Sequence, residues 1–278
     1  MKPQFSEFTY GYALIEEMSK NYRFKSVPTF PTLVEEGRVG GYDVALDIFG
    51  TPIFLQFKRS DYLSTANAKY HKYFSSNYYR FNLHALKHSK QHNLLLALER
   101  KGELVFYVAP KFHSQSSLHR HYFSSGIVKN SIWVSPLDIG SLPDNNEHSI
   151  CFNKSASLVY FCSEPRKIKL SKINKAPDLD EYFSEFTRPY SEALSPEKPE
   201  SNFLESRPIW EEIFESLSFV LEEQQPGFAR KVIDSLSGEN NLILKTAKMA
   251  KIGFGLDMLL IDPVNKSKHS DSVNAADL

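Results

Sequence analysis

Two apolar stretches, YDVALDI at residues 42–48 and PIFLQFK at 52–58, decide the fold that the sequence predicts. Apolar and other residues alternate in both stretches, and the connection between them is Phe49-Gly50-Thr51. Two alternating runs joined by a short connection that contains glycine are typical of a β-hairpin. We therefore expect an antiparallel hairpin whose turn lies near Gly50.

The register of this hairpin brings three polar side chains together. With the turn in this place, Asp43 lies opposite Gln56 or Phe57 on the second strand. Side chains alternate between the two faces of a strand, so Gln56 and Lys58 share a face. We therefore expect Asp43, Gln56 and Lys58 to lie close together at one end of the hairpin.

This combination of side chains suits the hydrolysis of phosphodiesters. A carboxylate and further oxygen ligands can hold Mg²⁺ or Mn²⁺, and the metal stabilises developing charge and acidifies a bound water. A lysine beside the metal can position that water and offset charge on the phosphorus. Asp43 and Gln56 are thus the candidate metal ligands, and Lys58 is the candidate residue that positions the nucleophile.

A helix is expected before the hairpin, over residues 6–22. Apolar side chains recur there at intervals of three or four residues, and Ser6 is a suitable N-cap. The helix carries two adjacent carboxylates, Glu16 and Glu17. On a helical wheel, Glu16 lies nearer the apolar stripe that runs through Tyr12, which favours Glu16 as the carboxylate that reaches the hairpin.

The order of a helix, Asp43 and then Gln56-Phe57-Lys58 resembles the PD-(D/E)xK nuclease superfamily, and in particular its Mrr-like branch, where the motif reads D…QxK. The resemblance covers residues 5–110. It implies an α/β fold with a restriction-endonuclease-like core: a helix, a mixed sheet with the catalytic β-hairpin, and a second helix. A mainly helical C-terminal region would follow this core.

The same resemblance implies an activity and a setting. The protein would be an Mg²⁺- or Mn²⁺-dependent endonuclease that cleaves DNA in bacterial restriction or defence against phage. In this branch a glutamate of the first helix completes the metal site, a role that Glu16 or Glu17 would fill. The chain has Gly41-Tyr42 before Asp43, where the superfamily motif has a proline.

The composition is that of a folded protein without a membrane segment. Of the 278 residues, 41% are hydrophobic and 13% are aromatic, which is enough for a packed interior. No stretch approaches the roughly 18 apolar residues of a membrane helix, and the N-terminus lacks the layout of a secretory signal. Cys151 and Cys162 have no ligand-like spacing and are interpreted as reduced core thiols. We therefore expect a cytoplasmic protein.

The charge pattern places nucleic acid on the first half of the chain. The 33 basic and 33 acidic residues give no net charge, which excludes a polybasic coat of DNA. Residues 58–129 are rich in basic side chains, whereas 178–223 are mainly acidic. The candidate contacts to DNA are Arg59, Tyr79, Arg80, Lys87 and Gln91.

Further elements are expected along the chain. Helices are predicted at 79–91 and 114–123, and strands at 94–98, 104–108, 132–134, 149–152 and 158–162. In the first of these helices, His84, His88 and His92 recur every four residues, a spacing that zinc sites use. No carboxylate falls on that face, so a polar surface is the favoured interpretation.

The expected domains are a nuclease domain at 1–165, a linker at 166–207, a mainly helical region at 208–262 and a disordered tail at 263–278. The helical region at 208–262 is expected to begin with an amphipathic helix that has Pro208 in its first turn. It is also expected to contain a strand at 256–261. The apolar stripe of that helix offers a contact for a partner protein. Cleavage of both DNA strands would instead imply a homodimer.

Two alternatives remain open. A degenerate nuclease fold would bind nucleic acid or a protein without catalysis. An interaction protein would act through residues 209–261. The sequence has no Gly-x-Ser-x-Gly elbow and no Walker A motif, so serine-hydrolase chemistry and nucleotide hydrolysis are not expected.

Overall fold

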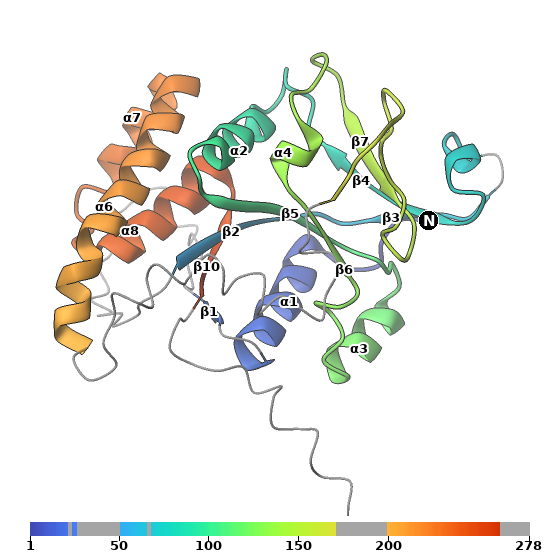
Figure 1. Cartoon of the computed structure of the whole chain (residues 1–278), viewed down its shortest axis with the longest axis horizontal. Coiled ribbons are helices and arrows are strands. Elements are labelled where there is room, and N and C mark those ends of the chain that lie inside the picture. Colours follow the sequence, from blue (N-terminus) through green and yellow to red (C-terminus); the bar gives the residue numbers. More distant parts are fainter. Residues whose placement is uncertain (22–23, 27–50, 66–67, 171–198, 262–278) are drawn as a thin grey trace, which may run out of the picture.

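A computed structural model of the chain has an α/β fold that contains two five-stranded sheets (Figure 1). The structure describes residues 1–21, 24–26, 51–65, 68–170 and 199–261. The strand order in the first sheet is β1 (Phe24–Ser26), β10 (Asp257–Ile261), β2 (Thr51–Phe57), β5 (Leu104–Pro110) and β6 (Ser131–Val134). The order in the second sheet is β3 (Asp61–Leu63), β4 (Tyr78–Leu83), β7 (His148–Phe152), β8 (Val159–Phe161) and β9 (Arg166–Lys167).

Helices lie on both faces of the first sheet (Figure 1). One face packs against α1 (Glu7–Asn21) and α3 (Gln115–Phe123). The other face packs against α2 (Gln91–Arg100), α6 (Pro199–Gln224), α7 (Pro226–Ser235) and α8 (Leu242–Met249). Shorter helical segments are η1 (His71–Tyr73), α4 (Pro136–Ile139) and the π-helical turn η3 (Ala250–Phe254).

Alternation along β2 explains why this strand has helices on both sides. Ile53, Leu55 and Phe57 belong to the core beneath α1, whereas Phe54 belongs to the core beneath α2. The approach of α1 is close at Gly11, where a Cβ atom would lie 2.8 Å from the Phe57 ring. Glycine at that position therefore lets the helix lie against the strand.

The structure gives β2 other neighbours than the predicted ones. β10 pairs antiparallel with residues 51–55, and β5 pairs parallel with 53–57. Over 53–55 both edges of the strand are thus occupied, so the predicted pairing of 52–58 with 42–48 is wrong there. Residues 42–48, with Asp43, lie outside the described residues. Alternation predicts a strand and its two faces, but not the strand that pairs with it.

The segment from 79 to 98 also differs from the prediction. Of the residues predicted as a helix at 79–91, those at 79–90 form most of β4 and a turn, and Gln91 begins α2. The strand predicted at 94–98 lies within α2. Buried and less buried residues alternate in β4, as in other strands. The run Leu94-Leu95-Leu96 is buried throughout, and a short apolar run of this kind does not distinguish a helix from a strand.

Most other elements agree with the prediction. In α1, the Ser6 hydroxyl accepts a hydrogen bond from the Thr9 N–H at 3.0 Å, which makes Ser6 a side-chain cap. In α3, Ser114 does the same for the Ser117 N–H. The strands predicted at 104–108, 132–134, 149–152, 158–162 and 256–261 correspond to β5, β6, β7, β8 and β10.

The C-terminal part of the chain is not a separate unit. β10 lies between β1 and β2 in the first sheet, and α6 to α8 share a core with α2 and the sheet. Trp210, Leu217 and Phe254 belong to the same apolar cluster as Phe54 and Leu95. The predicted division into domains at 1–165 and 208–262 is therefore wrong, because the chain returns to complete the first sheet.

The predicted linker at 166–207 needs the same correction at both ends. Arg166 and Lys167 form β9, and Ile168 is buried. α6 begins at Pro199, so Pro208 lies inside this helix and not in its first turn. Residues 171–198 and the tail from 262 lie outside the described part of the chain.

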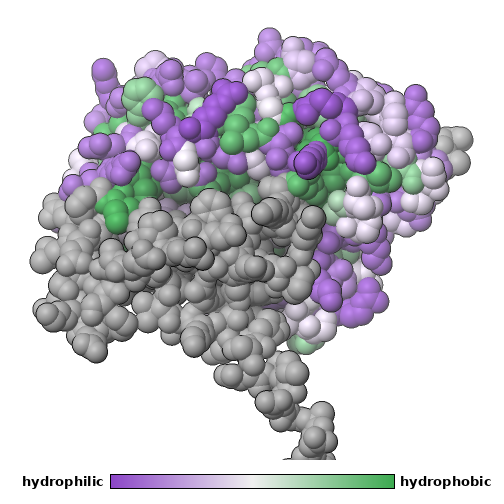
Figure 2. Space-filling model, viewed as in Figure 1, coloured by the Kyte–Doolittle hydropathy of each residue, from purple (hydrophilic) through white to green (hydrophobic). Residues whose placement is uncertain are grey.

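The described surface contains no extended apolar face in the view of Figure 2. Hydrophilic residues dominate this face, and the hydrophobic ones form small separate patches. Within the described ranges, no helix is both long and apolar enough to cross a membrane. Cys151 and Cys162 are buried and free, in agreement with their interpretation as core thiols.

Candidate active site

Lys58 lies at the edge of the first sheet where the carboxyl ends of β2 and β5 meet. Its backbone N–H donates to the Val108 carbonyl at 2.9 Å and extends the parallel ladder by one residue. The side chain is only 5% exposed, and Nζ lies 5.9 Å from the centre of the Tyr107 ring. The carboxyl edge of parallel strands is where open α/β sheets bind ligands. Lys58 is therefore well placed for a functional role.

The charge of Lys58 has no close counter-ion in the described part of the chain. None of the ion pairs there involves this lysine, and its one hydrogen-bond acceptor is Gln91 Oε1 at 3.4 Å. Burial lowers the pKa of the Lys58 ammonium, and the field of the Glu7 carboxylate opposes this shift. A buried cation is costly unless an anion balances it, and among the described residues no anion lies close to Lys58.

Gln91 connects Lys58 with Gln56. Its Nε2 donates to Gln56 Oε1 at 2.5 Å and also faces the Phe254 carbonyl at 3.3 Å. Gln56 Nε2 in turn donates to the Phe57 carbonyl. We call Gln56, Lys58 and Gln91 the amide–lysine cluster. An amide oxygen has two lone pairs, so Gln56 Oε1 keeps one for a further partner.

Gly255 lets the chain pass close to this cluster. It has a left-handed backbone with φ at +70°, which a residue with a Cβ adopts only with strain. A Cβ atom there would lie 3.0 Å from Gln91 Nε2 and 3.5 Å from Gln56 Oε1. The turn between η3 and β10 thus depends on glycine in order to hold both amides in place.

Two further titratable groups influence the cluster electrostatically. Glu7, in the first turn of α1, raises the pKa of Lys58. His84, in the exposed turn after β4, has its pKa lowered, mainly by the positive charge of Lys58 and then by burial. Glu7 was not among the residues predicted from the sequence, and His84 was considered there only for zinc. An acidic residue in the first helical turn was the available signal for Glu7.

The structure does not bring Glu16 or Glu17 to Lys58. The Glu17 carboxylate is buried and accepts the backbone N–H groups of Ile127 at 2.6 Å and Val128 at 3.3 Å. Glu16 is paired with Lys20 and accepts a hydrogen bond from the Tyr122 hydroxyl. Both carboxylates thus have other partners among the described residues, and the role of one of them in a metal shell stays a prediction.

The orientation of α1 differs from the predicted one. Tyr12, through which the apolar stripe was predicted to run, is 54% exposed, and Phe8 is 67% exposed. The buried stripe runs through Tyr10, Leu14 and Met18 instead, so the helix is rotated from the expected orientation. Glu16 also lies about 13 Å along the helix from Glu7, at 1.5 Å per residue.

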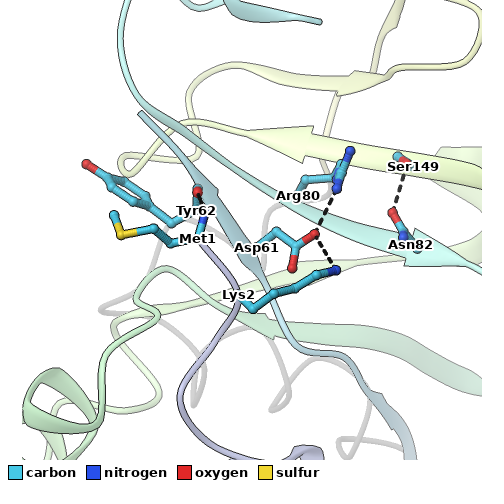
Figure 3. A network of polar contacts seen from close by, with 7 residues as sticks. All are labelled: Met1, Lys2, Asp61, Tyr62, Arg80, Asn82 and Ser149. Atoms are coloured by element: carbon cyan, nitrogen blue, oxygen red, sulfur yellow. Dashed lines mark hydrogen bonds and ion pairs between the residues drawn. The ribbon is translucent and has the colours of Figure 1, made fainter. Parts of the chain in front are cut away.

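Two residues predicted to contact nucleic acid, Tyr79 and Arg80, have structural roles. Tyr79 is buried and stacks on Phe152 with ring centres 5.7 Å apart, so its ring is not available to a base. Figure 3 shows Arg80 and Lys2 both directed at Asp61, at 2.8 Å and 3.3 Å from Oδ2. Arg80 therefore serves an ion-pair network between β3 and β4. Arg59 is exposed, which leaves its predicted role open.

The histidine series does not form a zinc site. His92 is buried in α2, where Nε2 contacts the Gly140 carbonyl at 2.8 Å and Nδ1 contacts the Tyr107 hydroxyl at 3.1 Å. His84 and His88 precede that helix. Within the described residues, no group of three or more histidine, cysteine, aspartate or glutamate side chains is arranged to hold a metal ion.

An open cleft of about 700 Å³ borders the amide–lysine cluster. We call it the α2–α7 cleft. Its walls are residues 86–91 with Leu94, residues 224–228 at the junction of α6 and α7, and residues 253–255 before β10. Gln91 and Gly255 thus belong to both the cluster and the cleft. Lys87 and Gln91, two of the predicted nucleic-acid contacts, lie on its wall.

The fold and this site define the chain as an α/β protein with a buried lysine and paired amides at the carboxyl edge of a mixed sheet. No protein-family model matches the chain, and neither the curated proteins nor the solved structures include a significant match. Any function proposed for the protein consequently depends on the residues of the site.

Proposed function

We propose that the protein is a nuclease that hydrolyses DNA phosphodiester bonds with Mg²⁺ or Mn²⁺. The observation that carries this proposal is the buried ammonium of Lys58, which has no counter-ion among the described residues. A phosphate group would balance this charge at the open edge of the sheet. The order of Gln56 and Lys58 on one strand, together with the resemblance to PD-(D/E)xK nucleases, supports the same assignment.

The side chains would divide the work as follows. The Lys58 ammonium offsets the negative charge that develops on the phosphate oxygens and holds the attacking water. Gln91 fixes both neighbours, because it accepts from Lys58 and donates to Gln56. His84, whose neutral form Lys58 favours, lies close enough to feel that charge and would accept or return a proton.

The proposed metal ion is supported by the sequence pattern of Asp43 and Gln56. Among the described residues, Gln56 supplies one amide oxygen and no carboxylate cluster accompanies it. These residues do not form a metal site by themselves. Asp43, the proposed carboxylate ligand, lies outside the described residues.

The proposed setting follows from the resemblance, and the proposed cytoplasmic location follows from the composition. The setting is bacterial DNA restriction or defence against phage, in the cytoplasm, with a homodimer as the form that cuts both strands. A contact with a partner protein through the C-terminal helices has less support, since Trp210, Leu217 and Leu221 of α6 are buried in the core.

Cleavage of supercoiled plasmid tests the proposed function. Wild type is incubated with Mg²⁺, with Mn²⁺ or with EDTA, beside Asp43→Ala and Lys58→Ala. We expect nicking that requires the metal and that both substitutions abolish. Nicking that survives both substitutions would assign the activity to another site, and nicking in EDTA would exclude the metal.

A second candidate is a nuclease-fold module that binds nucleic acid without cleaving it. The contact between Gln91 and Gln56 favours it, because one lone pair of the Gln56 amide oxygen, a candidate metal ligand, is already used. Such a module would show no rise in melting temperature with Mn²⁺, and Asp43→Ala would leave that temperature unchanged or raise it. The nuclease would be stabilised by Mn²⁺ and would lose this stabilisation in Asp43→Ala.

A further inference from the structure

The α2–α7 cleft has a basic lining in a protein without net charge. Lys87, Lys90 and His88 are on its walls, and none of the aspartates and glutamates in the described ranges lines it. Lys87 forms no hydrogen bond or ion pair with any described residue, and Lys90 Nζ contacts the Gln224 carbonyl at 3.2 Å. The lining thus presents positive charge to the open space.

Two helices begin at the walls of the cleft. The N-cap positions of α2 and α7 are Lys90 and Gln225, and neither side chain caps its helix. Neither first turn contains an acidic residue. Helix amino ends carry partial positive charge, so both add to the field of the lysines. Glu222 and Glu223, near the end of α6, do not line the cleft.

An aromatic ring shares this space with the charges. Phe228, in the first turn of α7, lines the cleft and is 40% exposed. Proteins that hold unpaired nucleic-acid strands combine a basic groove with exposed aromatic rings, on which bases stack. Duplex DNA keeps its bases stacked on each other, so an exposed ring is of use chiefly to an unpaired strand.

The cleft also leads to the amide–lysine cluster. Gln91 lines the cleft while its side chain contacts both Lys58 and Gln56. Gly255 also lines the cleft, and a Cβ atom added to it would lie 3.0 Å from Gln91 Nε2. A chain of phosphates seated between α2 and α7 would therefore continue toward the buried ammonium of Lys58.

We infer that the α2–α7 cleft binds the phosphate backbone of an unpaired nucleic-acid strand, with Lys87 and Lys90 on the phosphates and Phe228 against a base. One part of this inference rests on the proposed nuclease function. It is the direction of the strand, which would run from the cleft toward Lys58 and present the next phosphodiester bond to that lysine. The C-terminal helices then serve as one wall of the substrate cleft.

Binding is measured by the fluorescence anisotropy of labelled single-stranded oligodeoxythymidine in EDTA, where a metal-dependent enzyme cannot cleave. The test variant is Lys87→Glu/Lys90→Glu. The matched control is Lys129→Glu/Lys154→Glu, which changes the same charge at exposed positions outside the cleft. Circular dichroism checks that both double variants are folded.

We expect the cleft variant to bind at least about tenfold more weakly than the control. The slope of log affinity against log salt should fall by about 1.4 relative to the control, because each lost phosphate contact on a single strand contributes about 0.7. Phe228→Ala should weaken single-strand binding and leave the salt slope unchanged, and wild type should prefer single-stranded oligonucleotide to duplex.

Equal affinities and equal salt slopes for the two double variants would overturn the inference, as would wild type that fails to bind. A preference for duplex would overturn the assignment to an unpaired strand. Cleavage by Lys58→Ala reports separately on the proposed function. If this variant cleaves like wild type while the cleft variant fails to bind, the nuclease site is wrong and the cleft assignment stands.

Discussion

Gln91 Nε2 lies 2.5 Å from Gln56 Oε1, although the two residues are 35 positions apart. The contact joins the amino end of α2 to the end of β2, just before Lys58. It also means that the orientation of the Gln56 amide is set by another side chain. In the proposed nuclease, the position of α2 would therefore control how the cluster meets the substrate.

Gln91→Ala tests this control. The substitution removes the hydrogen-bond partners of Lys58 and Gln56, so we expect plasmid cleavage to fall by about tenfold or more. The loss of stability should be about 1–2 kcal/mol, as for one hydrogen-bonded polar group. Gln115→Ala, which removes a glutamine from α3 on the other face of the sheet, is the control. Equal cleavage by the two variants would contradict the role of Gln91.

Gly255→Ala and Gly140→Ala form a matched pair. Both glycines have positive φ, at +70° and +74°, but a Cβ atom would meet neighbours within 4 Å only at Gly255, namely the Gln91 and Gln56 amides. Both variants should lose stability, by about 1–2 kcal/mol at the left-handed Gly255 and by about 1–3 kcal/mol at Gly140, where φ of 74° and ψ of −170° are adopted almost only by glycine. Cleavage should fall in Gly255→Ala alone, as plasmid assays and thermal unfolding would measure. A loss of cleavage in both variants would contradict the claim that Gly255 acts through the Gln91 and Gln56 amides.

Glu17 is expected to be a structural carboxylate. Glu17→Ala leaves the Ile127 and Val128 N–H groups without their acceptor, which should cost about 2–3 kcal/mol in urea unfolding. Glu16→Ala removes a partly exposed ion pair and should cost no more than about 1 kcal/mol. If Glu17 ligated a catalytic metal instead, Glu17→Ala would abolish cleavage at temperatures where the protein remains folded.

Glu103 links stability to pH. Burial, and then the field of Glu212 on α6, raise the pKa of Glu103 to about 7. The folded protein therefore binds this proton more tightly than the unfolded chain. Its contribution to stability is complete at low pH, declines as pH rises from about 4.5 to about 7, and then levels off.

Substitution of Glu103 reveals this dependence. Glu103→Gln should match wild type near pH 4.5 and exceed its stability by about 1–3 kcal/mol at pH 8. Urea unfolding at both pH values measures the difference. Glu215→Gln, an exposed residue of α6, should show no such gain. A gain of equal size from Glu215→Gln would indicate a general effect of charge and contradict the assignment to Glu103.

The sequence was informative where a local pattern determines the structure. Alternation identified β2, and the shared face of Gln56 and Lys58 followed from it. The antiparallel partner of β2 could not be inferred in this way, because β10 is about 200 residues away and periodicity carries no information about distant pairing. The amphipathic stripe of α1 was misjudged because aromatic Phe8 and Tyr12 are exposed.

The candidate site shows the same limit. Gln56 and Lys58 are neighbours on one strand, so their proximity was predictable. Gln91 was predicted only as a contact to DNA, since the helix that positions it begins where the predicted helix ended. Gly255 and the α2–α7 cleft come from segments that meet only when the chain returns to the first sheet. Tertiary packing, and not local propensity, brings them together.

The most direct test of the central claim is the rate constant for plasmid cleavage with enzyme in excess over DNA, measured for Lys58→Ala beside Lys129→Ala. Lys129 is an exposed lysine outside the cleft and the cluster. We expect Lys58→Ala to lower the rate constant about a hundredfold or more and Lys129→Ala to leave it unchanged. A rate constant for Lys58→Ala equal to that of wild type would contradict the claim that this buried lysine acts in phosphodiester cleavage.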